Sequence, residues 1–511
     1  MAVLQTPGNP DDACMAVPAD LDDRRVVYPL TPMDGNPVSR ANLQFVFFYA
    51  LDTAQKSQLR PTLRSAFYKT MAQYPILYGK MEQVCGTKES TRSTVQVVVT
   101  RKHAETDGMP LYEEHHQVEQ TVAQIRDSGY NWSMWPPQLM KIPVARGTMA
   151  TQVADAPLVQ CIVTWLSDGL GILFSVDHSI VDGVGIDILI NKWAQTARGL
   201  QEPSVSLSSP PSSPLSAAAD FDHHSFYRDV LRNNNQPKDD WFVQYIDTLD
   251  MPAHVPANAI VNQNLEAVEQ ALQTNVHSLR ITPESLARLH KDMNESGTAA
   301  NPLSAIRLAY ALVWQRYMIA KNTTEEGETQ QQQQQQTSSD TADTGFLNII
   351  HNARHLVSRP HYIGNAVCPT YMRLPVSCPS AESPPSPSEC ICEIAQTIGT
   401  YMHATSRSQW LAFCHRMLDP VWFPKFLTVF ANPKANQLTV SNISRLSFYD
   451  ADFGFGAPLH ATLYPTLIPG FTTWLPMGPA GGLHILWNIP LTVLDVLAKD
   501  QLFCRYVDIV F

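Results

Sequence analysis

Strand patterns and helix patterns alternate along most of this chain, and this alternation limits the folds that it can form. Apolar and β-branched runs predict buried strands, and apolar residues at helical spacing predict the helices between them. The predicted strands cover residues 42–51, 94–100, 158–166 and 171–176, and the predicted helices cover residues 58–73, 184–197 and 304–319. Mixed elements in this order are typical of an α/β protein.

Three segments lack any such pattern and are expected to lie in solvent. Residues 202–217 are rich in Pro and Ser, residues 322–344 contain the glutamine tract Gln330 to Gln336, and residues 378–389 are again rich in Pro and Ser. The tract is interpreted as a loop of variable length, with weak self-association as the alternative. The stretch near residue 210 is the natural boundary between two lobes.

The composition favours a globular enzyme and argues against several kinds of partner. Hydrophobic residues make up 44% of the 511 residues and charged residues 16%, and the formal net charge is −11. An acidic chain without basic runs is not expected to bind nucleic acid or anionic membranes. The nine cysteines lack metal-ligand spacing and are interpreted as reduced thiols. No signal peptide pattern or membrane-length apolar run is found, so we expect a cytoplasmic protein.

The most informative segment carries the pattern His-x-x-x-Asp-Gly at His178, Asp182 and Gly183. An apolar strand runs into the histidine, and a helix follows the glycine. A neutral imidazole at the end of a rigid strand can take a proton from an attacking alcohol or amine. Asp182 could orient the loop, and Gly183 would allow backbone angles that other residues resist. The alternative is a plain helix start, in which Asp182 is only a cap and His178 packs or contacts solvent.

A second motif lies far along the chain, where Asp452, Phe453, Gly454, Phe455 and Gly456 form the sequence Asp-Phe-Gly-Phe-Gly. An ordinary turn is the alternative, because Asp and Gly are common turn residues. Its presence together with the histidine motif favours the functional interpretation.

The two motifs in this order resemble those of the BAHD acyltransferases of plants and fungi, HxxxDG and DFGWG. The segments from Tyr28 to Asp34, from Tyr74 to Lys80, from Ser304 to Arg316, from Asn352 to Arg354 and from Tyr362 to Ala366 are also similar to that family.

The resemblance implies an α/β fold of two chloramphenicol-acetyltransferase-like lobes with mixed sheets and an active-site tunnel between them. The N-terminal lobe would span residues 1–200, a crossover loop 201–240 and the C-terminal lobe 241–511. The DFGFG motif would lie in the C-terminal lobe, and 322–344 would be a disordered Gln-rich loop.

The resemblance also implies the chemistry. His178 would be the general base for direct transfer of an acyl group from acyl-CoA, without an acyl-enzyme. Asp182 would pair with an arginine, for which Arg354 is the candidate. The residues Gly183, Asp452, Phe453, Gly454, Phe455, Gly456 and Arg354 would have structural roles. Phe455 stands where the family has tryptophan, and Asp177 stands where many relatives have a second histidine.

The segment from Ser444 to Asp452 looks closest to the hydroxycinnamoyl-CoA:shikimate/quinate transferases of secondary metabolism. In those enzymes an arginine holds an acceptor carboxylate, so Arg445 is the candidate here. The alternative is a surface arginine paired with Asp450 or Asp452. Thr473 and Trp474 would line the acceptor side, with an ordinary aromatic strand as the alternative.

Other signals are weaker. The pairs His115-His116 and His223-His224 lie in polar surroundings without a third ligand at metal spacing, so we expect no metal site. We expect no permanently bound cofactor, acyl-CoA as co-substrate, a small alcohol or amine as acceptor, and a monomer. Two other functions stay open: a relative of the same fold that only binds a ligand or partner, and a condensation-type enzyme that uses a carrier-protein thioester.

Overall fold

The computed structural model describes residues 25–31, 33–34, 42–84, 94–105, 108–140, 157–199, 276–295, 302–329, 344–357, 362–377, 386–417, 419, 422, 425–426, 436–464, 470–479 and 481–510. The chain forms two units, each discontinuous in sequence. The first unit comprises Met1–Tyr227, His361–Asn365 and Ser447–Thr462, and the second comprises Arg228–Pro360, Ala366–Leu446 and Leu463–Phe511. The predicted crossover loop at 201–240 lies outside the described residues.

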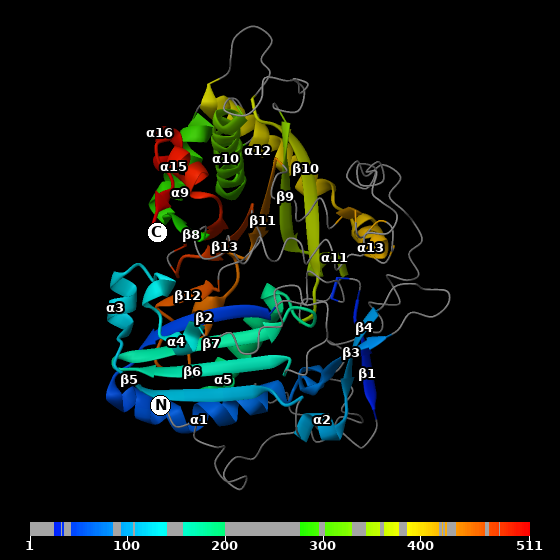
Figure 1. Ribbon diagram of the computed structural model, residues 1–511, viewed down its shortest axis with the longest axis vertical. Coiled ribbons are helices and arrows are strands. Elements are labelled where there is room, and N and C mark those ends of the chain that lie inside the picture. The colour runs from blue at the N-terminus through cyan, green and yellow to red at the C-terminus, as the bar shows by residue number, and fades with distance from the viewer. Residues whose placement is uncertain are drawn as a thin grey trace. The chain divides into compact units, whose positions relative to one another are not determined.

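The first unit is built on a five-stranded sheet with the order β12-β2-β7-β6-β5 (Figure 1). Its strands are β12 (His460–Leu463), β2 (Asn42–Ala50), β7 (Gly169–Asp177), β6 (Val159–Leu166) and β5 (Leu111–Val118). Strand β7 pairs antiparallel with β2 on one side and with β6 on the other, and every one of its residues is buried. A continuous apolar run is what a strand covered on both faces requires.

Helices cover this sheet, and a small second sheet belongs to the same unit. Helix α1 (Thr53–Met71) packs against α5 (Gly183–Ala197), and Trp193 Nε1 donates to the Leu63 carbonyl oxygen at 3.0 Å. The short helices α3 (Val122–Asp127) and α4 (Pro137–Met140) contact the sheet strands. The small sheet contains β1 (Val26–Pro29), β4 (Thr94–Val99) and β3 (Lys80–Val84), and the remaining short elements are η2 (Pro75–Tyr78), α2 (Arg101–Glu105) and η3 (Trp132–Met134).

A late segment of the chain returns to the first unit and completes its sheet. Phe448, in η5 (Phe448–Asp450), packs against Phe45 of β2 with ring centroids 4.7 Å apart. Tyr49 Oη donates to the Ala451 carbonyl oxygen at 2.8 Å, and β12 then pairs with β2. The DFGFG motif therefore belongs to the first unit, and its predicted place in the C-terminal lobe is wrong. Order along the chain does not show this return, because the contacts that cause it are long-range.

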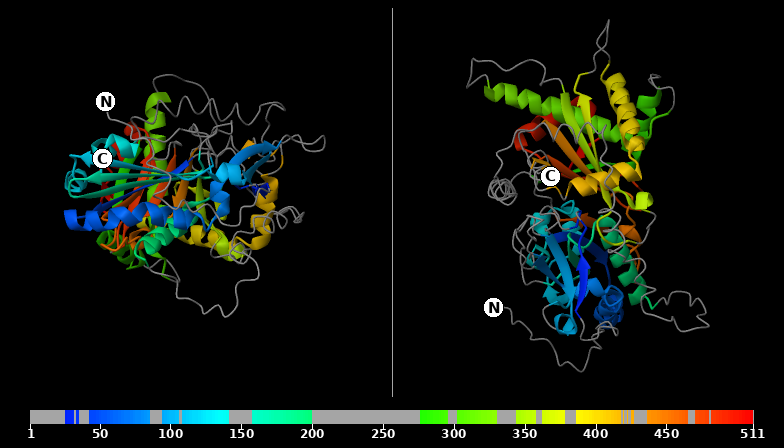
Figure 2. Two further views of the ribbon diagram at one scale, coloured as in Figure 1. Left: turned by 90° about the horizontal axis from the view of Figure 1, so that it is seen from below. Right: turned by 90° about the vertical axis from the view of Figure 1, so that its right-hand side faces the viewer.

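The second unit contains a seven-stranded mixed sheet with the order β10-β9-β11-β13-β14-β8-β15. Its strands are β10 (Val367–Pro375), β9 (Thr344–Asn352), β11 (Gln437–Asn442), β13 (Phe471–Pro476), β14 (Leu483–Asn488), β8 (Val276–Ile281) and β15 (Asp508–Ile509). Its helices are α9 (Pro283–Glu295), α10 (Ala305–Thr329), α11 (Arg354–Val357), α12 (Pro387–Ala404), α13 (Arg407–Arg416), α15 (Leu491–Leu497) and α16 (Gln501–Cys504). Helix α10 packs against α9, α12 and α15 (Figure 2), and one apolar core joins these helices to the sheet.

These elements confirm the predicted fold class, an α/β protein with mixed sheets in two lobes. The predicted strands and helices are present, but α10 continues to Thr329. The loop predicted to begin at Asn322 therefore cannot begin before residue 330, and the glutamine tract lies outside the described residues. The added turns contain Asn322, Thr323, Thr324 and Gly327, which have low helix propensity, so the sequence did not predict this extension.

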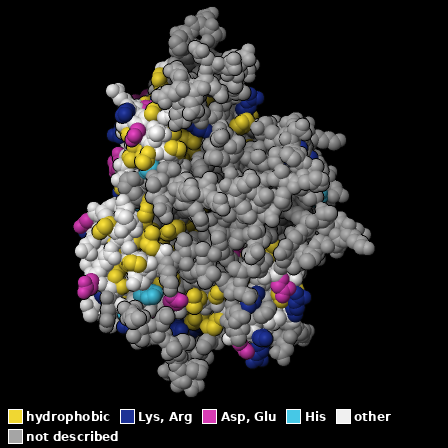
Figure 3. Space-filling model, viewed as in Figure 1, with side chains coloured by type: hydrophobic (Ala, Val, Ile, Leu, Met, Phe, Trp, Pro, Cys, Tyr) yellow, Lys and Arg dark blue, Asp and Glu magenta, His cyan; other side chains and the backbone are white. Residues whose placement is uncertain are grey.

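Most of the described cysteines are unpaired. Five cysteines are free thiols: Cys161, Cys368, Cys392, Cys414 and Cys504. Cys390 is disulfide-bonded, so the prediction of reduced thiols does not hold for it. Among the described helices, none is long and apolar enough to cross a bilayer. On the face shown in Figure 3, the basic and acidic side chains of the described residues are interspersed.

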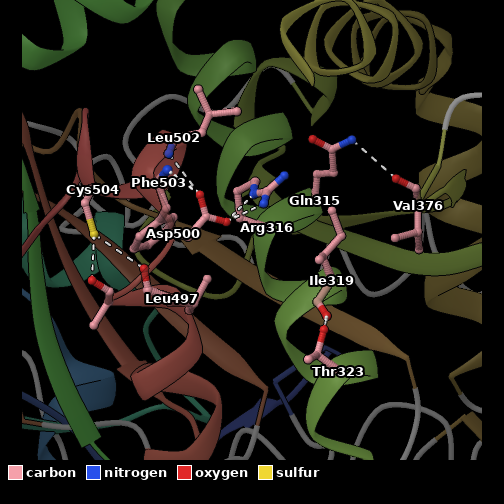
Figure 4. Close-up of polar contacts among 11 residues, drawn as sticks. Gln315, Arg316, Ile319, Thr323, Val376, Leu497, Asp500, Leu502, Phe503 and Cys504 are labelled. Atoms are coloured by element: carbon pink, nitrogen blue, oxygen red, sulfur yellow. Dashed lines mark hydrogen bonds and ion pairs between the residues drawn. The ribbon is translucent and has the colours of Figure 1, made fainter. Parts of the chain in front are cut away.

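An ion pair links α10, the long helix of the second unit, to Asp500 near the end of the chain. Arg316 of α10 donates through Nε to Asp500 Oδ2 at 2.6 Å (Figure 4). The other oxygen of Asp500 caps α16 by accepting from the backbone N–H groups of Leu502 and Phe503, both at 3.0 Å. The side chains of Arg316 and Asp500 are only 17% and 12% exposed, so solvent screens the pair weakly.

We expect Arg316→Met to lower the free energy of unfolding of this unit by about 2 kcal/mol, because it leaves a mostly buried carboxylate without its cation. Methionine keeps the apolar stem. The control Arg101→Met removes the exposed Arg101–Glu105 pair and should cost less than about 0.5 kcal/mol. Urea unfolding measures both variants, and equal losses would contradict a stabilising role for the Arg316 pair.

Candidate active site

His178 lies in the turn that joins β7, the central strand of the five-stranded sheet of the first unit, to helix α5. It follows β7 directly, and α5 begins five residues later at Gly183. Two hydrogen bonds start the turn: the Ser179 N–H donates to Asp177 Oδ1 at 2.9 Å, and the Ile180 N–H donates to the Asp177 carbonyl oxygen at 3.1 Å. Ile180 and Val181 are fully buried, so the turn is anchored by packing as well.

The imidazole of His178 is half-buried and held in one tautomer. Its Nδ1 lies 2.8 Å from the Val181 carbonyl oxygen. A carbonyl oxygen only accepts hydrogen bonds, so Nδ1 carries a proton, and in the neutral imidazole Nε2 carries the free lone pair. This arrangement leaves Nε2 as a base that can take a proton from a second molecule.

Asp182 is the N-cap of α5. Its side chain is buried, and Oδ1 accepts from the Gly185 N–H at 2.9 Å. The cap satisfies a backbone donor that the helix itself leaves unpaired, and it fixes where the turn ends. Arg354, its predicted partner, begins α11 in the second unit, and its backbone N–H and Nη1 donate to Asn352 Oδ1 at 2.9 and 3.2 Å. A pairing between Asp182 and Arg354 stays a prediction.

The glycine that the turn requires is Gly185. A side chain there would collide with the backbone carbonyl group of Ile363, so only glycine allows the segment around Ile363 to lie against the first turn of α5. Gly183 is the first residue of α5 and does not have a positive φ. The conformational role suggested for Gly183 from sequence is therefore wrong, because the constraint is close approach two residues later.

The DFGFG motif forms a loop around one carboxylate oxygen. Asp452 Oδ1 accepts from the backbone N–H groups of Gly454, Phe455 and Gly456 at 2.7, 2.9 and 2.8 Å. Gly454 and Gly456 have φ of 108° and 101°, which residues with a side chain rarely adopt. Because Phe455 contributes its backbone N–H to this loop, the loss of the family's tryptophan indole does not remove any of these three bonds.

The loop is tied to helix α5 by one ion pair and one aromatic contact. Asp452 Oδ2 lies 3.6 Å from Nη1 of Arg198, which is the C-cap of α5. The Phe453 ring packs against Trp193 and Tyr49, with centroids 4.9 and 5.6 Å apart. Burial alone would raise the pKa of Asp452, but the three backbone N–H groups and Arg198 outweigh it and lower that pKa.

The three predicted substrate residues all lie in the second unit. Arg445 is exposed in the turn after β11, and no ion pair among the described residues involves it. Burial raises the pKa of Tyr310 to about 12, while the Asn442 hydrogen bond and the charge of Arg445 act in the opposite direction. Arg445 is therefore close enough to the Tyr310 hydroxyl to influence it, which the sequence did not indicate.

Thr473 and Trp474 are neighbours on β13 and are both buried. Successive side chains of a strand point to opposite faces, so the two cannot line the same surface. Trp474 belongs to the apolar core of the second unit, and its ring lies 4.8 Å from that of Tyr310. Its Nε1 is buried and has no hydrogen-bond partner among the described residues.

The histidine pair on β5 lies beside an arginine and two glutamates. Arg60 Nη2 donates to His116 Nε2 at 2.9 Å, and Glu114 and Glu113 lie 3.5 and 3.7 Å from His116 and His115. No group of three or more potential metal ligands was found within the described ranges. His223 and His224 lie outside those ranges.

Two residues to which the sequence gave no role are linked by hydrogen bonds to the backbone of His178, Asn365 directly and Asp34 through Asn365. Asn365 Nδ2 donates to the His178 carbonyl oxygen at 2.5 Å and to Asp34 Oδ1 at 2.7 Å. Both residues belong to segments similar to the BAHD family, but a pattern of similar residues does not say which atoms meet. Only the fold brings residues 34, 178 and 365 together.

The fold is shared with proteins of known structure, some of them in complex with coenzyme A. TRI101 of F. graminearum, in complex with coenzyme A and deoxynivalenol, matches with a TM-score of 0.69 at 14% identity, covering 95% of this chain and 100% of that chain. The ethyl coenzyme A complex of the same protein matches with a TM-score of 0.69 at 14% identity, covering 96% of this chain and 100% of that one. Vinorine synthase matches with a TM-score of 0.54 at 16% identity, covering 94% and 92%. At these identities the likeness shows the fold alone.

The family model described as Transferase family matches residues 140–468 of this chain. The chain therefore belongs to this family, as the resemblance to BAHD acyltransferases predicted. No curated protein matches the chain in sequence. The closer resemblance to shikimate/quinate transferases stays a prediction.

We expect Asp452→Asn to remove a pH-dependent part of the stability, because Asn keeps an oxygen acceptor but loses the charge. The folded-state pKa of Asp452 is lower than its ordinary value of 3.8. The charged form therefore stabilises the fold above pH 3.8, and this contribution is lost as the pH falls through the folded-state pKa.

Thermal unfolding midpoints at a series of pH values measure this effect. The wild-type protein should be more stable than the variant at pH 7, and the difference should shrink below about pH 4. The exposed Asp127→Asn serves as a control and should change little at any pH. A difference for Asp452→Asn that is constant over the whole pH range would contradict the assignment.

Proposed function

We propose that this protein transfers an acyl group from acyl-CoA to a hydroxyl or amine of a small molecule, with His178 as general base. The observation that carries the proposal is the tautomer of His178, whose Nδ1–H is engaged by the Val181 carbonyl oxygen and whose Nε2 is left basic. The family match and the fold of coenzyme A-binding relatives support the choice of acyl donor.

The proposed reaction is a direct transfer in a ternary complex. Nε2 of His178 takes the proton of the acceptor O–H or N–H as the acceptor atom attacks the thioester carbonyl carbon. The C–S bond then breaks, the acyl group stays on the acceptor, and the CoA thiolate takes the proton back from the imidazolium. The products are the ester or amide and free CoA, and the histidine is neutral again.

Asp182 has a positioning role in this proposal and does not exchange protons. Its carboxylate is occupied in capping α5, so it determines where the turn that carries His178 ends. The proposed pairing with Arg354 would hold the same carboxylate from its other oxygen. The proposal further includes action as a monomer in the cytoplasm, which stays a prediction.

We expect His178→Ala to lower kcat by about 10²- to 10⁴-fold because it removes the base, with only a small fall in the thermal unfolding midpoint from the lost hydrogen bond to the Val181 carbonyl oxygen. Release of free CoA from a panel of acyl-CoAs and acceptors, followed with a thiol reagent, measures the rate. His290→Ala removes an exposed histidine of α9 and should keep the wild-type rate. Nearly full activity of His178→Ala would disprove the base assignment, and turnover with carrier-bound acyl groups alone would favour the condensation-type alternative.

The finer proposal concerns the acceptor, for which Arg445 supplies a cation. It is exposed, and no carboxylate among the described residues neutralises it. An arginine can bind a carboxylate through two parallel hydrogen bonds. We therefore propose a hydroxy acid as acceptor, as in the hydroxycinnamoyl transferases that the surrounding segment resembles.

We expect Arg445→Ala to raise KM for an acidic acceptor about 10- to 100-fold while leaving KM for its neutral methyl ester nearly unchanged. Arg373→Ala, which removes an exposed arginine of β10, is the matched control. Steady-state kinetics with the acid and the ester measure the difference. Equal effects of Arg445→Ala on both acceptors would remove the carboxylate-binding role.

A further inference from the structure

Hydrogen bonds of Asn365 join three segments that are far apart in sequence, one of them through the backbone of His178, and all three belong to the first unit. Asp34 lies shortly after β1, His178 follows β7, and Asn365 lies in the short segment that returns from the second half of the chain. Asp34 and Asn365 are buried. Buried polar side chains are costly unless they are fully paired, so this cluster needs a physical explanation.

The amide of Asn365 can have only one orientation. Both groups that its Nδ2 approaches, the His178 carbonyl oxygen at 2.5 Å and Asp34 Oδ1 at 2.7 Å, are acceptors. The two hydrogens of the NH2 group are therefore both in use, one on each acceptor. The backbone N–H of Asn365 also donates to Asp34 Oδ1, at 2.9 Å, so its main chain and side chain are fixed by the same oxygen.

Asp34 is in turn held from its other side. Its Oδ2 accepts from the Thr31 hydroxyl at 2.6 Å and from the Thr31 N–H at 3.2 Å. The carboxylate thus accepts from donors on both oxygens, which only the charged form can do without loss. Burial raises the pKa of Asp34 to about 6, against the effect of these hydrogen bonds, so the carboxylate is charged at neutral pH.

The segment that carries Asn365 also touches the turn at a second point. The Ile363 carbonyl group lies so close to Gly185 that no side chain fits there, and the Gly185 N–H is the donor that Asp182 caps. The segment therefore contacts the turn of His178 both at its first residue and just after its last. Two contacts fix both the position and the orientation of the segment relative to the turn, whereas a single contact would still allow rotation about it.

We propose that Asn365, held by Asp34, is a positioning residue that fixes the backbone of His178 so that the Nδ1–H bond to Val181 forms. The inference rests on the proposed function in one respect, which is that His178 is the base. Among the described hydrogen bonds, Asn365 reaches His178 at its carbonyl oxygen, so in this proposal its effect on the reaction passes through the placement of the ring.

The first test is kinetic and uses Asn365→Asp, which keeps the shape but puts an oxygen against the His178 carbonyl oxygen and the Asp34 carboxylate. We expect kcat to fall about 10- to 100-fold, because a displaced base loses its alignment, while KM for both substrates stays within about twofold. If this variant does not fold, Asn365→Ala removes the same donor without adding charge and is measured in its place.

Thr70→Val is the matched control for the loss of a buried hydrogen bond in the same unit. Thr70 is fully buried on α1, and its hydroxyl donates to the Ala66 carbonyl oxygen at 2.9 Å. We expect this variant to have a lower unfolding midpoint but a kcat within about twofold of the wild type. A kcat of Asn365→Asp that stays within twofold of the wild type would overturn the proposal.

A double-mutant cycle separates positioning from general damage. If Asn365 acts through His178, Asn365→Asp should cause no further loss in the His178→Ala background, because the group that it positions is already absent. An equal loss in both backgrounds would show that Asn365 only maintains the surrounding structure, and this outcome also overturns the proposal.

A spectroscopic test does not depend on turnover, so it separates failure of this inference from failure of the proposed function. Histidine labelled with 15N reports which ring nitrogen carries the proton, and the His178 signals are those lost in His178→Ala. We expect the Nδ1–H tautomer in the wild type and in Thr70→Val, and a mixture of tautomers in Asn365→Asp. If the wild type releases no CoA, this test still decides, and an unchanged tautomer in Asn365→Asp overturns the inference.

Discussion

The hydrogen bond between His178 Nδ1 and the Val181 carbonyl oxygen determines what the site can do. It spans only three residues, so it depends entirely on the shape of the turn between β7 and α5. That shape is imposed from several sides: the Asp177 side chain starts the turn, buried Ile180 and Val181 anchor it, and Asp182 ends it by capping the helix. A reactive side chain placed on rigid elements needs no rearrangement when a substrate arrives.

Helix α5 connects the two sequence motifs physically. Its first turn holds Asp182 and Gly185, and its C-cap Arg198 meets the carboxylate of the DFGFG loop. In the loop, several backbone N–H groups donate to the same oxygen of Asp452, and Gly454 and Gly456 occupy the positions with positive φ. The motif therefore stabilises the far end of the helix whose near end adjoins the base. This also explains why phenylalanine at 455 is compatible with the loop, since its contribution is a backbone group.

Much of the fold could be predicted from the sequence, because local patterns determine it. The apolar run of β7 and the helical spacing of α5 indicated their positions within one or two residues, and so they also located His178 between them. The returns of residues 361–365 and 447–462 to the first unit could not be predicted, because they depend on contacts such as Phe45 with Phe448 that are hundreds of residues apart. For the same reason the sequence did not indicate roles for Asn365 and Asp34, because these roles follow from hydrogen bonds between distant segments. The sequence pattern points to Gly183 and not to Gly185 for a similar reason, since the carbonyl group of Ile363 that excludes a side chain at Gly185 comes from a distant segment.

The discontinuity of the first unit has a consequence for how the protein is made. A ribosome delivers the chain from its N-terminus, and domains usually fold in that order as they emerge. Strand β2 and the turn of His178 emerge early, but their edge strand β12 and the segment of Asn365 are synthesised only after much of the second unit. Until then β2 presents an unpaired apolar edge, a surface that invites wrong pairing with other chains. The nascent protein must therefore spend most of its synthesis with one lobe unfinished, and its yield in the cell should depend on how well chaperones shield that edge.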